Sequence, residues 1–305
     1  MSKKRVLITG ANGLLGQKLI DLYLDKSDKE LIATAKGECR HPEKNKLNYC
    51  ELDITNEEDV KTVIEKYKPH CVINTAAMTN VDACESEQEL CDSLNVKAVE
   101  YIAKHCLNNQ VHLIHLSTDF IFDGTHGPLD ENETPNPLSY YGWSKLKGEN
   151  IIKQHGENWA ILRTVLVYGI VADMSRSNIV LWAKGALEKG QSIKVVDDQY
   201  RTPTLAEDLA MGCFLAEDKH AKGIFNISGK DFMSIFELVN RVADYFHLDK
   251  SIIERTNSST LNQAAKRPPI TGFVLDKAIK ELGYNPHSFE QGIELMLNQL
   301  KIEQK

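Results

Sequence analysis

The stretch "RVLITGANGLLGQKL", residues 5–19, decides the fold. A strand-like apolar run leads into Gly10, Gly13 and Gly16, and a helical pattern follows. Glycines at these places allow a tight turn and let the backbone approach a pyrophosphate, while the N-terminus of the next helix attracts the phosphate charge. Three glycines alone are weak evidence, but their place between a strand and a helix is the context that the motif requires. The stretch predicts dinucleotide binding, with a plain turn as the alternative.

Strand-like runs and helical patterns alternate through the first half of the chain. The strand-like runs are residues 5–9, 31–35, 71–76, 112–117 and 160–167. Between two of them, residues 57–67 carry apolar side chains at helical spacing. Continuous apolar strands that alternate with amphipathic helices indicate a parallel sheet covered on both faces. We therefore predict an α/β fold with a doubly wound parallel sheet of the Rossmann type.

The alternation loosens after residue 168. A helical pattern near 178–189, a turn-rich segment at 197–204, a "KRPP" break at 266–269 and a terminal helical stripe at 288–300 follow. We predict a Rossmann domain in residues 1–168 and a smaller α/β substrate-binding lobe mainly in residues 169–305. The chain is expected to return to the first domain after about residue 200, because the boundary between the two patterns is not sharp.

Composition favours a small-molecule partner. A net charge of -7 and a pI near 5.8 oppose nucleic acids and anionic membranes, which select clustered positive charge. The N-terminus has no signal-peptide pattern, and no segment approaches the length of a membrane span. Seven cysteines without C-x-x-C spacing suggest neither a disulfide framework nor a zinc site. We expect a cytoplasmic protein without a metal, nucleic-acid or membrane partner.

The ends of the second and third strands bear on the type of cofactor. An acidic residue after the second strand favours NAD, whereas a basic residue accommodates the 2′-phosphate of NADP. The segment "ATAKGECR" offers Lys36 and Arg40, and Glu38 lies beyond a glycine. We expect NADPH, with NADH as the alternative if both basic side chains are only solvated loop charges. Asp53 and Ile54 follow the third strand, where they could border the adenine.

The stretch "SYYGWSKLKGE", residues 139–149, pairs a tyrosine with a lysine. Lys145 follows Tyr141 by four residues, so both side chains share one face of a helix, whereas Tyr140 has Ser144 at this spacing. Reduction of a ketone needs a proton at the carbonyl oxygen, and an ammonium beside a phenol lowers the pKa of the phenol. Together with the glycine loop and the segment "STDFIFDG", residues 117–124, this pair makes Tyr141 the candidate acid. A solvated surface pair is the alternative that these two residues leave open.

Two histidines lie in the strand before this helix. His112 and His115 are three residues apart, so within one strand they point to opposite faces. They cannot easily share a metal ion. We expect them to be core or edge residues.

Eight segments in order resemble one group of enzymes. They are "TGANGLLG", "INTAAMTNVDACE", "LNV", "HLSTDFIFDG", "YYGWSKLKGE", "LRTVLVYG", "DQYRTPT" and "KRPPITGFVLDK". Together they resemble the extended short-chain dehydrogenase/reductases, and among these most closely the dTDP-4-dehydrorhamnose reductases, from about residue 4 to 285. The resemblance implies NADPH-dependent reduction of the 4-keto group of dTDP-4-dehydro-L-rhamnose to dTDP-L-rhamnose, in nucleotide-sugar biosynthesis.

The resemblance also assigns roles to single residues. It implies that Thr118 hydrogen-bonds the substrate carbonyl beside Tyr141, and that Lys145 also holds the nicotinamide ribose. Asn95 matches an asparagine that supports the lysine, although a cap or polar core role is equally open. The predicted cofactor site comprises Gly10, Asn12, Gly13, Leu14, Leu15, Gly16, Lys36, Asp53, Ile54, Ala76, Ala77, Asn95, Tyr141 and Lys145. The predicted substrate side comprises Met78, Thr79, Val81, Thr118, Asp119 and Arg201.

Three positions depart from the family pattern. Leu166 stands where the family commonly has a tryptophan near the sugar, which leaves the sugar less certain than the reaction. Lys18 stands where some bacterial members carry a glutamate that helps to bind magnesium between two subunits; a homodimer is open, but a metal-bridged dimer is not expected. Arg201 replaces a small residue, and its guanidinium either contacts the nucleotide diphosphate as a bidentate fork or forms a surface salt bridge.

Two other functions are open from the sequence. One is a reductase or epimerase that acts on another nucleotide sugar with the same fold and cofactor. The other is a non-catalytic binding module, like the regulatory β subunit of methionine adenosyltransferase, which also resembles this family. Intact Thr118, Tyr141 and Lys145 favour catalysis, because a pure binding module has no need of them. The exact sugar and the oligomeric state are not specified by the sequence.

Overall fold

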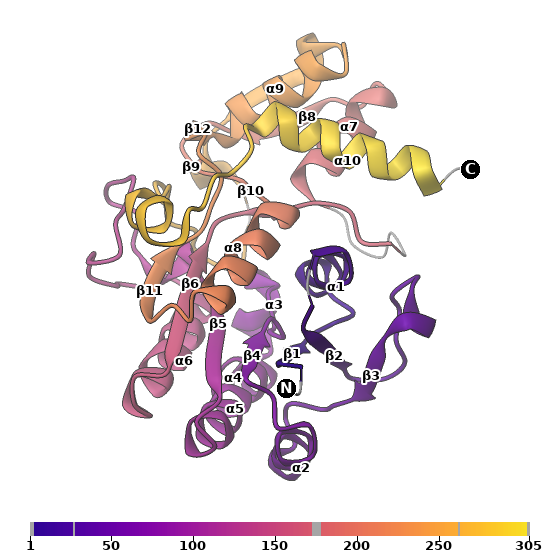
Figure 1. Ribbon diagram of the computed structural model, residues 1–305. Coiled ribbons are helices and arrows are strands. Elements are labelled where there is room, and N and C mark those ends of the chain that lie inside the picture. Colours follow the sequence, from indigo (N-terminus) through magenta and orange to yellow (C-terminus); the bar gives the residue numbers. More distant parts are fainter. Residues whose placement is uncertain (1–2, 27, 173–177, 262, 304–305) are drawn as a thin grey trace.

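The large sheet has seven strands, all parallel. The computed structural model describes residues 3–26, 28–172, 178–261 and 263–303. The strand order is β11-β6-β5-β4-β1-β2-β3. The strands are β1 (Arg5–Thr9), β2 (Glu30–Ala35), β3 (Asn48–Glu51), β4 (Cys71–Asn74), β5 (His112–Thr118), β6 (Trp159–Thr164) and β11 (Gly223–Asn226). This sheet confirms the predicted Rossmann-type α/β fold (Figure 1).

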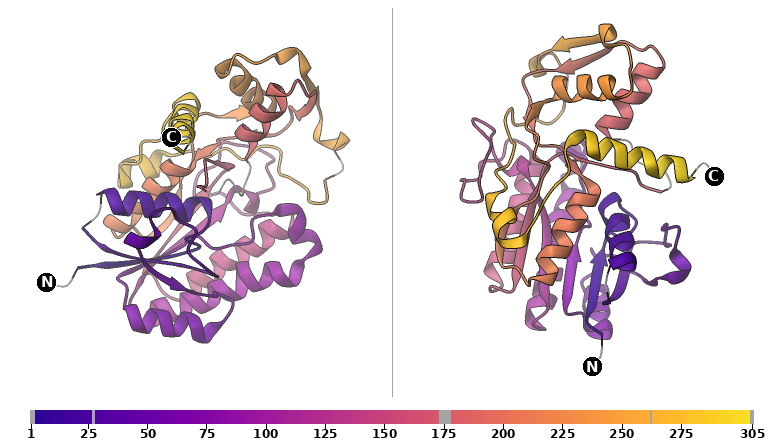
Figure 2. Two further views of the ribbon diagram at one scale, coloured as in Figure 1. Left: turned by 90° about the vertical axis from the view of Figure 1, so that its right-hand side faces the viewer. Right: turned by 45° about the horizontal axis from the view of Figure 1, so that its top comes forward.

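Helices cover both faces of the sheet (Figure 2). One face carries α1 (Leu14–Lys26) and α8 (Ala206–Asp218); the other carries α2 (Glu57–Tyr67), α5 (Ala98–Asn108) and α6 (Tyr140–Gln154). In β1, Val6 and Ile8 join the apolar cluster of α1 and α8, whereas Leu7 joins the cluster of α2 and α5. A strand that is buried on both faces needs apolar side chains in both directions, which explains its continuous apolar run.

The chain begins in the middle of the sheet. β1 pairs with β2 on one side and with β4 on the other, so the winding reverses between β1 and β4. In open α/β sheets, ligands bind in the crevice that such a reversal leaves at the carboxyl ends of the strands. The glycine loop, residues 10–16, follows β1 at this place.

A smaller lobe lies beyond the large sheet and holds its own apolar core (Figure 1). Its helices are α7 (Ile179–Glu188), α9 (Ile235–Tyr245) and α10 (Phe289–Glu303), and its strand pairs are β7 (Val167–Tyr168) with β10 (Thr204–Leu205), β8 (Ile193–Val196) with β13 (Ile253–Thr256), and β9 (Tyr200–Arg201) with β12 (Met233–Ser234). Between β10 and β12 the chain returns to the large sheet as α8 and β11. The division at residue 168 stays a prediction.

Short helices complete the described structure. They are α3 (Val81–Ser86), α4 (Gln88–Asp92), η1 (Lys44–Lys46), η2 (Ser93–Lys97), η3 (Asp119–Ile121), η4 (Lys250–Ile252), η5 (Ser258–Thr260) and η6 (Ala278–Leu282). No helix among the residues that the structure describes is long and apolar enough to cross a membrane. All seven cysteines are free thiols.

The run predicted as one strand at 160–167 is two strands. β6 ends at Thr164 and β7 begins at Val167, with Leu166 between them at a φ of 39°. A bulky residue in this left-handed region is strained. The bend takes the chain out of the large sheet, and β7 pairs with β10 in the smaller lobe. The sequence pattern hides the bend because the apolar run continues through it.

A buried ion pair fastens α6 to β6. The Arg163 Nε and Nη2 atoms donate to the two carboxylate oxygens of Glu149 at 3.0 and 2.9 Å, and neither side chain is more than 2% exposed. We predict that Glu149→Ala lowers the free energy of unfolding by about 3–5 kcal/mol, because it leaves an uncompensated buried charge. Urea unfolding measures this loss.

The matched control breaks a more exposed pair. Glu188 accepts from Lys184 one helical turn away at 2.6 Å, and Glu188→Ala is expected to cost at most ~0.5 kcal/mol. Equal losses in the two variants would contradict the prediction.

Candidate active site

A cleft of about 800 Å³ lies at the carboxyl ends of the central strands. Its lining joins the glycine loop, the residues after β2 and β3, the end of β5, and α6. The lining includes Gly10, Asn12, Gly13, Leu14, Leu15, Gly16, Lys36, Asp53, Ile54, Ala76, Ala77, Tyr141, Lys145, Thr79, Val81, Thr118 and Asp119. Of the predicted site residues, Asn95, Met78 and Arg201 are not part of it. The binding role of each residue stays a prediction.

The glycine loop is packed too tightly for side chains at its two ends. A Cβ atom on Gly16 would lie 2.2 Å from the carbonyl oxygen of Gly10, and Gly10 itself has a φ of 72°. The Gly13 amide donates to the same carbonyl oxygen at 2.9 Å, which closes the turn. Leu14 and Leu15, the first residues of α1, border the cleft, so the free amides of the helix N-terminus lie beside it. The loop therefore fits the pyrophosphate of a dinucleotide.

Two cations border the end of the cleft where an adenosine ribose is expected. Lys36 and Arg40 both line it, and the Lys36 Nζ atom lies 2.6 Å from Asp53 Oδ2. The hydrogen bond from Lys36 holds the pKa of Asp53 below its usual range, so Asp53 is ionised at neutral pH. Asn12 fixes the loop that carries Arg40 by accepting from the Arg40 amide at 2.8 Å. Two cations at this end of the cleft suit a 2′-phosphate better than a plain ribose hydroxyl.

The structure distinguishes the two adjacent tyrosines. Tyr141 is 8% exposed and lines the cleft, whereas Tyr140 does not line it and has Lys147 Nζ 5.7 Å from its ring centre. Ser139 caps α6 by accepting from the Gly142 amide at 3.2 Å. At Gly142 a Cβ atom would lie 2.2 Å from the Phe120 carbonyl oxygen, so α6 begins pressed against η3. This close approach brings Tyr141 to the end of β5.

Burial controls the protonation of Tyr141 and Lys145. Burial raises the pKa of Tyr141 above its ordinary value, and a hydrogen bond with Thr118 opposes the rise. Burial also lowers the pKa of Lys145 to about 8, against the charge of Glu149. Tyr141 is thus a neutral phenol at neutral pH, and Lys145 is mostly ammonium. Although the ammonium is nearby, the pKa of Tyr141 lies above its ordinary value and not below it, because burial favours the neutral phenol.

Thr118 and Asp119 share a hydrogen bond at the end of β5. The Thr118 hydroxyl donates to Asp119 Oδ1 at 3.0 Å and accepts from the Phe120 amide at 3.2 Å. The Thr271 hydroxyl donates to Asp119 Oδ2 at 2.5 Å. A hydroxyl has a single hydrogen to donate. Thr118 can therefore donate to a ketone oxygen only after it turns away from Asp119.

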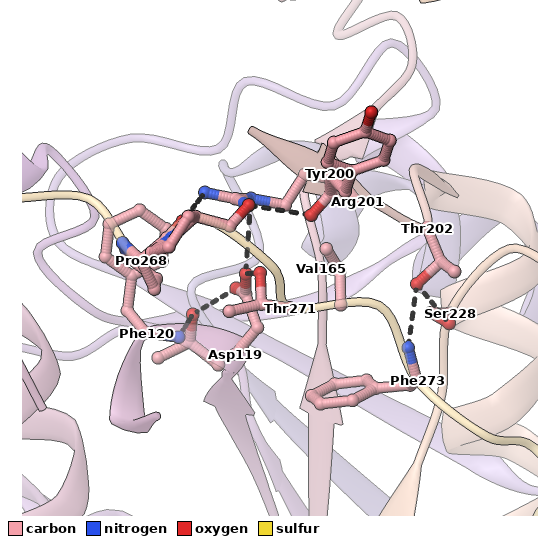
Figure 3. Close-up of polar contacts among 12 residues, drawn as sticks. Asp119, Phe120, Val165, Tyr200, Arg201, Thr202, Ser228, Pro268, Thr271 and Phe273 are labelled. Atoms are coloured by element: carbon pink, nitrogen blue, oxygen red, sulfur yellow. Dashed lines mark hydrogen bonds and ion pairs between the residues drawn. The ribbon is translucent and has the colours of Figure 1, made fainter. Parts of the chain in front are cut away.

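Arg201 is buried behind Asp119 (Figure 3). Its guanidinium donates to the carbonyl oxygens of Tyr200, Pro269 and Pro268 at 2.7, 3.1 and 2.7 Å, and its Nε lies 3.6 Å from Asp119 Oδ2. The surface salt bridge is wrong, because Arg201 is only 4% exposed. The contact with a diphosphate stays a prediction that this geometry does not support, since Arg201 lies outside the cleft lining and these donors already have acceptors.

Asn95 has the polar core role that the sequence left open. Its side chain exchanges hydrogen bonds of 2.9 and 3.0 Å with the backbone of Met78 and donates to Ser144 Oγ at 3.0 Å. Lys145 contacts β5 and not Asn95. Its Nζ donates to the Leu116 carbonyl oxygen at 2.7 Å and lies 3.4 Å from His115 Nε2. His115 is buried, as expected for a core histidine. Its place beside Lys145 left no signal in the sequence.

Lys18 lies between the large sheet's helices and the C-terminal helix. Its Nζ atom lies 3.2 Å from Glu207 Oε1 on α8 and 2.9 Å from Gln299 Oε1 on α10. No cluster of three or more His, Cys, Asp or Glu side chains that could hold a metal ion occurs within the described residues. The ammonium of Lys18 thus joins three helices within one chain.

The chain is similar to known proteins over the length of both lobes. The sequence profile described as "RmlD substrate binding domain" matches residues 4–302. Methionine adenosyltransferase 2 subunit beta of Danio rerio is 33% identical over 87% of this chain and 81% of its own length. A dTDP-4-dehydrorhamnose reductase of Aggregatibacter actinomycetemcomitans is 29% identical over 95% of this chain and 97% of its own.

Two solved structures share the fold over nearly their whole length. A dTDP-4-dehydrorhamnose reductase from Clostridium acetobutylicum has a TM-score of 0.85 at 28% identity, with 97% of this chain and 99% of that chain covered. The dTDP-4-dehydrorhamnose reductase of Bacillus anthracis in complex with NADP has a TM-score of 0.83 at 26% identity, with 98% and 100% covered. The similarity therefore extends across the glycine loop, the cleft and the smaller lobe.

We predict that Gly16→Ala weakens dinucleotide binding at least about tenfold, because the new Cβ atom forces the Gly10 carbonyl out of the loop. Fluorescence titration with NADPH measures the dissociation constant, and circular dichroism reports folding. Gly185→Ala on α7 is the control, since nothing lies within 4 Å of a Cβ atom there. Unchanged affinity in a folded Gly16→Ala variant would contradict the predicted pyrophosphate site.

Proposed function

Because this chain belongs to the RmlD substrate-binding domain family, we propose that it is an oxidoreductase that reduces dTDP-4-dehydro-L-rhamnose to dTDP-L-rhamnose with NADPH. The observation that carries the proposal is the meeting of Thr118, Tyr141 and Lys145 with the glycine loop in one cleft. The names of the reductase relatives support the reaction, and the NADP complex of the Bacillus anthracis protein supports the cofactor. NADH is the alternative cofactor.

The residues of the cleft can supply the proton and the stabilisation of negative charge that the reduction needs, but not the hydride. Bound NADPH would provide the hydride to the carbonyl carbon. Tyr141 is a neutral phenol and donates its proton to the carbonyl oxygen, so that the ketone becomes an alcohol. The ammonium of Lys145 stabilises the phenolate that is left. Thr118 turns its hydroxyl from Asp119 to the same carbonyl oxygen, where it stabilises the developing negative charge.

Arg201 lowers the cost of this turn by Thr118. When Thr118 leaves, Asp119 loses one hydrogen bond in a buried place. Thr271 still donates to its other oxygen, and the positive charge of Arg201 lies 3.6 Å away. Asp119 thus stays compensated, and an unpaired buried carboxylate is avoided. We assign Arg201 to this support of Asp119 rather than to the nucleotide.

The sugar is the part of the proposal that the cleft specifies least. Its substrate side mixes apolar Val81, Leu166 and Val171 with polar Thr79 and Asn178. An apolar patch suits the methyl group of a 6-deoxy sugar, and the polar side chains suit hydroxyls. Another nucleotide-linked keto sugar is the nearest alternative substrate. The cytoplasm is the proposed location, and any homodimer would form without a bridging metal at Lys18, whose ammonium occupies that place.

A non-catalytic binding role is the second candidate. The observation in its favour is that the Danio rerio subunit is more identical to this chain than the Aggregatibacter reductase is, at 33% against 29%. Against it stands the cleft, where a buried phenol, a buried lysine and a hydroxyl meet. A protein that only binds a partner needs no such group of side chains.

The decisive experiment offers dTDP-4-dehydro-L-rhamnose to the purified protein and follows the consumption of NADPH and NADH in parallel. We expect NADPH consumption, with dTDP-L-rhamnose identified by chromatography. Tyr141→Phe should lower kcat at least about a hundredfold, because the proton donor is lost, and leave NADPH affinity nearly unchanged. Tyr140→Phe is the matched control and should keep full activity. If the wild type binds NADPH but consumes none, the substrate assignment fails and the binding role gains support.

The rate should fall above pH 8. Lys145 must be charged to stabilise the Tyr141 phenolate, and its pKa is about 8, so the active form is present below this pH and is lost as the pH rises through it. The value of kcat/KM for NADPH reports the free enzyme. We expect it to fall with a midpoint near pH 8 and a slope of one proton. A rate that stays constant up to pH 10 would show that Lys145 keeps its proton or is not needed.

A further inference from the structure

A buried row of polar side chains leads from Lys145 across the sheet. Lys145 Nζ lies 3.4 Å from His115 Nε2, and His115 Nδ1 lies 3.0 Å from Asn74 Nδ2. The Thr9 hydroxyl donates to Asn74 Oδ1 at 2.6 Å. The residues come from α6, β5, β4 and β1, and none is more than 3% exposed. Thr9 directly precedes Gly10, so the row connects the lysine with the start of the glycine loop.

The chemistry of the groups fixes the direction of these hydrogen bonds. An ammonium only donates, so His115 Nε2 must accept, and the neutral ring carries its hydrogen on Nδ1. In the structure the Asn74 NH₂ group faces His115 Nδ1, and the Asn74 oxygen accepts from the Thr9 hydroxyl. The two ends of an amide are told apart only by such a network, and a charged Lys145 requires the reverse orientation, with the Asn74 oxygen toward His115 and its NH₂ group toward Thr9. With the amide as it stands in the structure, the neutral ring of His115 carries its hydrogen on Nε2, so this N–H and the ammonium would be two donors facing each other. With the amide in the reverse orientation, each contact from Lys145 through His115 and Asn74 to Thr9 pairs a donor with an acceptor.

The imidazole of His115 is neutral. Burial, and next the charge of Lys145, lower the pKa of His115 well below its usual value. Only the neutral ring keeps a lone pair for the ammonium. Thr9 and Asn74 do not titrate, and both are buried, so the row ends inside the protein and is no path for protons to solvent.

We propose that His115 is a positioning residue, which holds the ammonium of Lys145 by accepting one of its three hydrogens. A second hydrogen goes to the Leu116 carbonyl oxygen at 2.7 Å. With two hydrogens fixed on β5, the third is directed to the cleft, where Tyr141 lies. The importance of this orientation of the third hydrogen rests on the proposed function, in which Lys145 stabilises the Tyr141 phenolate.

The hydrogen bond also keeps Lys145 charged. Burial lowers the pKa of Lys145, and the charge of Glu149 and the thiol of Cys91 oppose the fall. Glu149 is already matched by Arg163, and Tyr141 is uncharged at neutral pH. His115 Nε2 contacts the ammonium at 3.4 Å, and as an acceptor it favours the charged form of Lys145 directly.

The test measures the titration of Lys145 itself. NMR of protein that carries ¹³Cε-lysine follows the Lys145 signal against pH, with the signal assigned by its absence from Lys145→Met. In His115→Phe, which keeps the volume of the ring but offers no acceptor, we expect the midpoint to fall by about one pH unit, a tenfold larger acid constant, since a hydrogen bond to a charged group is lost. His115→Gln, whose amide oxygen accepts, should recover at least half of the shift.

The same strand offers a matched control. His112 is 1% exposed and lies against the Ala221 carbonyl oxygen and Cys71, at 2.8 and 3.8 Å, on the opposite face from His115. His112→Phe should therefore leave the Lys145 midpoint unchanged, although it disturbs the core as much. Should His115→Phe fail to fold, His115→Leu gives the same comparison. An unchanged midpoint in the folded variant, or an equal fall in His112→Phe, would overturn the proposal.

The titration needs no keto sugar, so it separates this proposal from the proposed function. If the wild type proves inactive but the His115→Phe midpoint falls, His115 holds the lysine and only the assigned reaction fails. If the wild type is active and the midpoint does not move, the reaction stands and the role of His115 fails. When both hold, the fall of kcat/KM with pH should move by the same amount as the midpoint.

Discussion

The parallel pairing of β1, β4 and β5 obliges the segments that follow these strands to leave the sheet at one edge. That edge receives the glycine loop after β1, Thr75 to Thr79 after β4, and Thr118 with Asp119 after β5. None of these segments needs to find the others by its own contacts, because the backbone ladder fixes their spacing. The cleft is thus a consequence of strand order, and the side chains only determine what it can do.

Helix α6 meets this edge with three ionisable groups, one turn apart. Tyr141 and Lys145 face the cleft, and Glu149 lies one turn further on, paired with Arg163. Burial opposes charge on each of them, but the outcomes differ. The phenol becomes a weaker acid, and the ammonium becomes a stronger acid. The carboxylate stays charged because a guanidinium donates to both of its oxygens. A single helix therefore carries a protonated acid, a cation poised near neutral pH and a fixed anion.

The parts of the site that the sequence predicts are those whose cause is local. The glycines predict the loop because only glycine tolerates its turn and its close contacts. Tyr141 and Lys145 can be recognised as a pair because about four residues make one helical turn. The sequence does not predict the roles of three buried residues, Arg201, Asn95 and His115. Each is polar and buried, and its partner lies on an element distant in the chain, so no spacing in the sequence names that partner. The bend at Leu166 was not predicted from the sequence for a related reason, because the apolar character of a residue does not determine its φ angle.

A reductase and a subunit of methionine adenosyltransferase are both similar to this chain, so the site, rather than the fold, must decide between the two functions. Burying Lys145, Asp119 and Arg201 costs folding free energy, since each loses its hydration. The structure offsets this cost with directed contacts: His115 and a carbonyl oxygen for the lysine, two hydroxyls for the carboxylate, three carbonyl oxygens for the guanidinium. A surface that only docks a partner would be more stable with apolar residues in these places. A cleft whose buried charges are individually held in position is the arrangement that proton and hydride transfer requires.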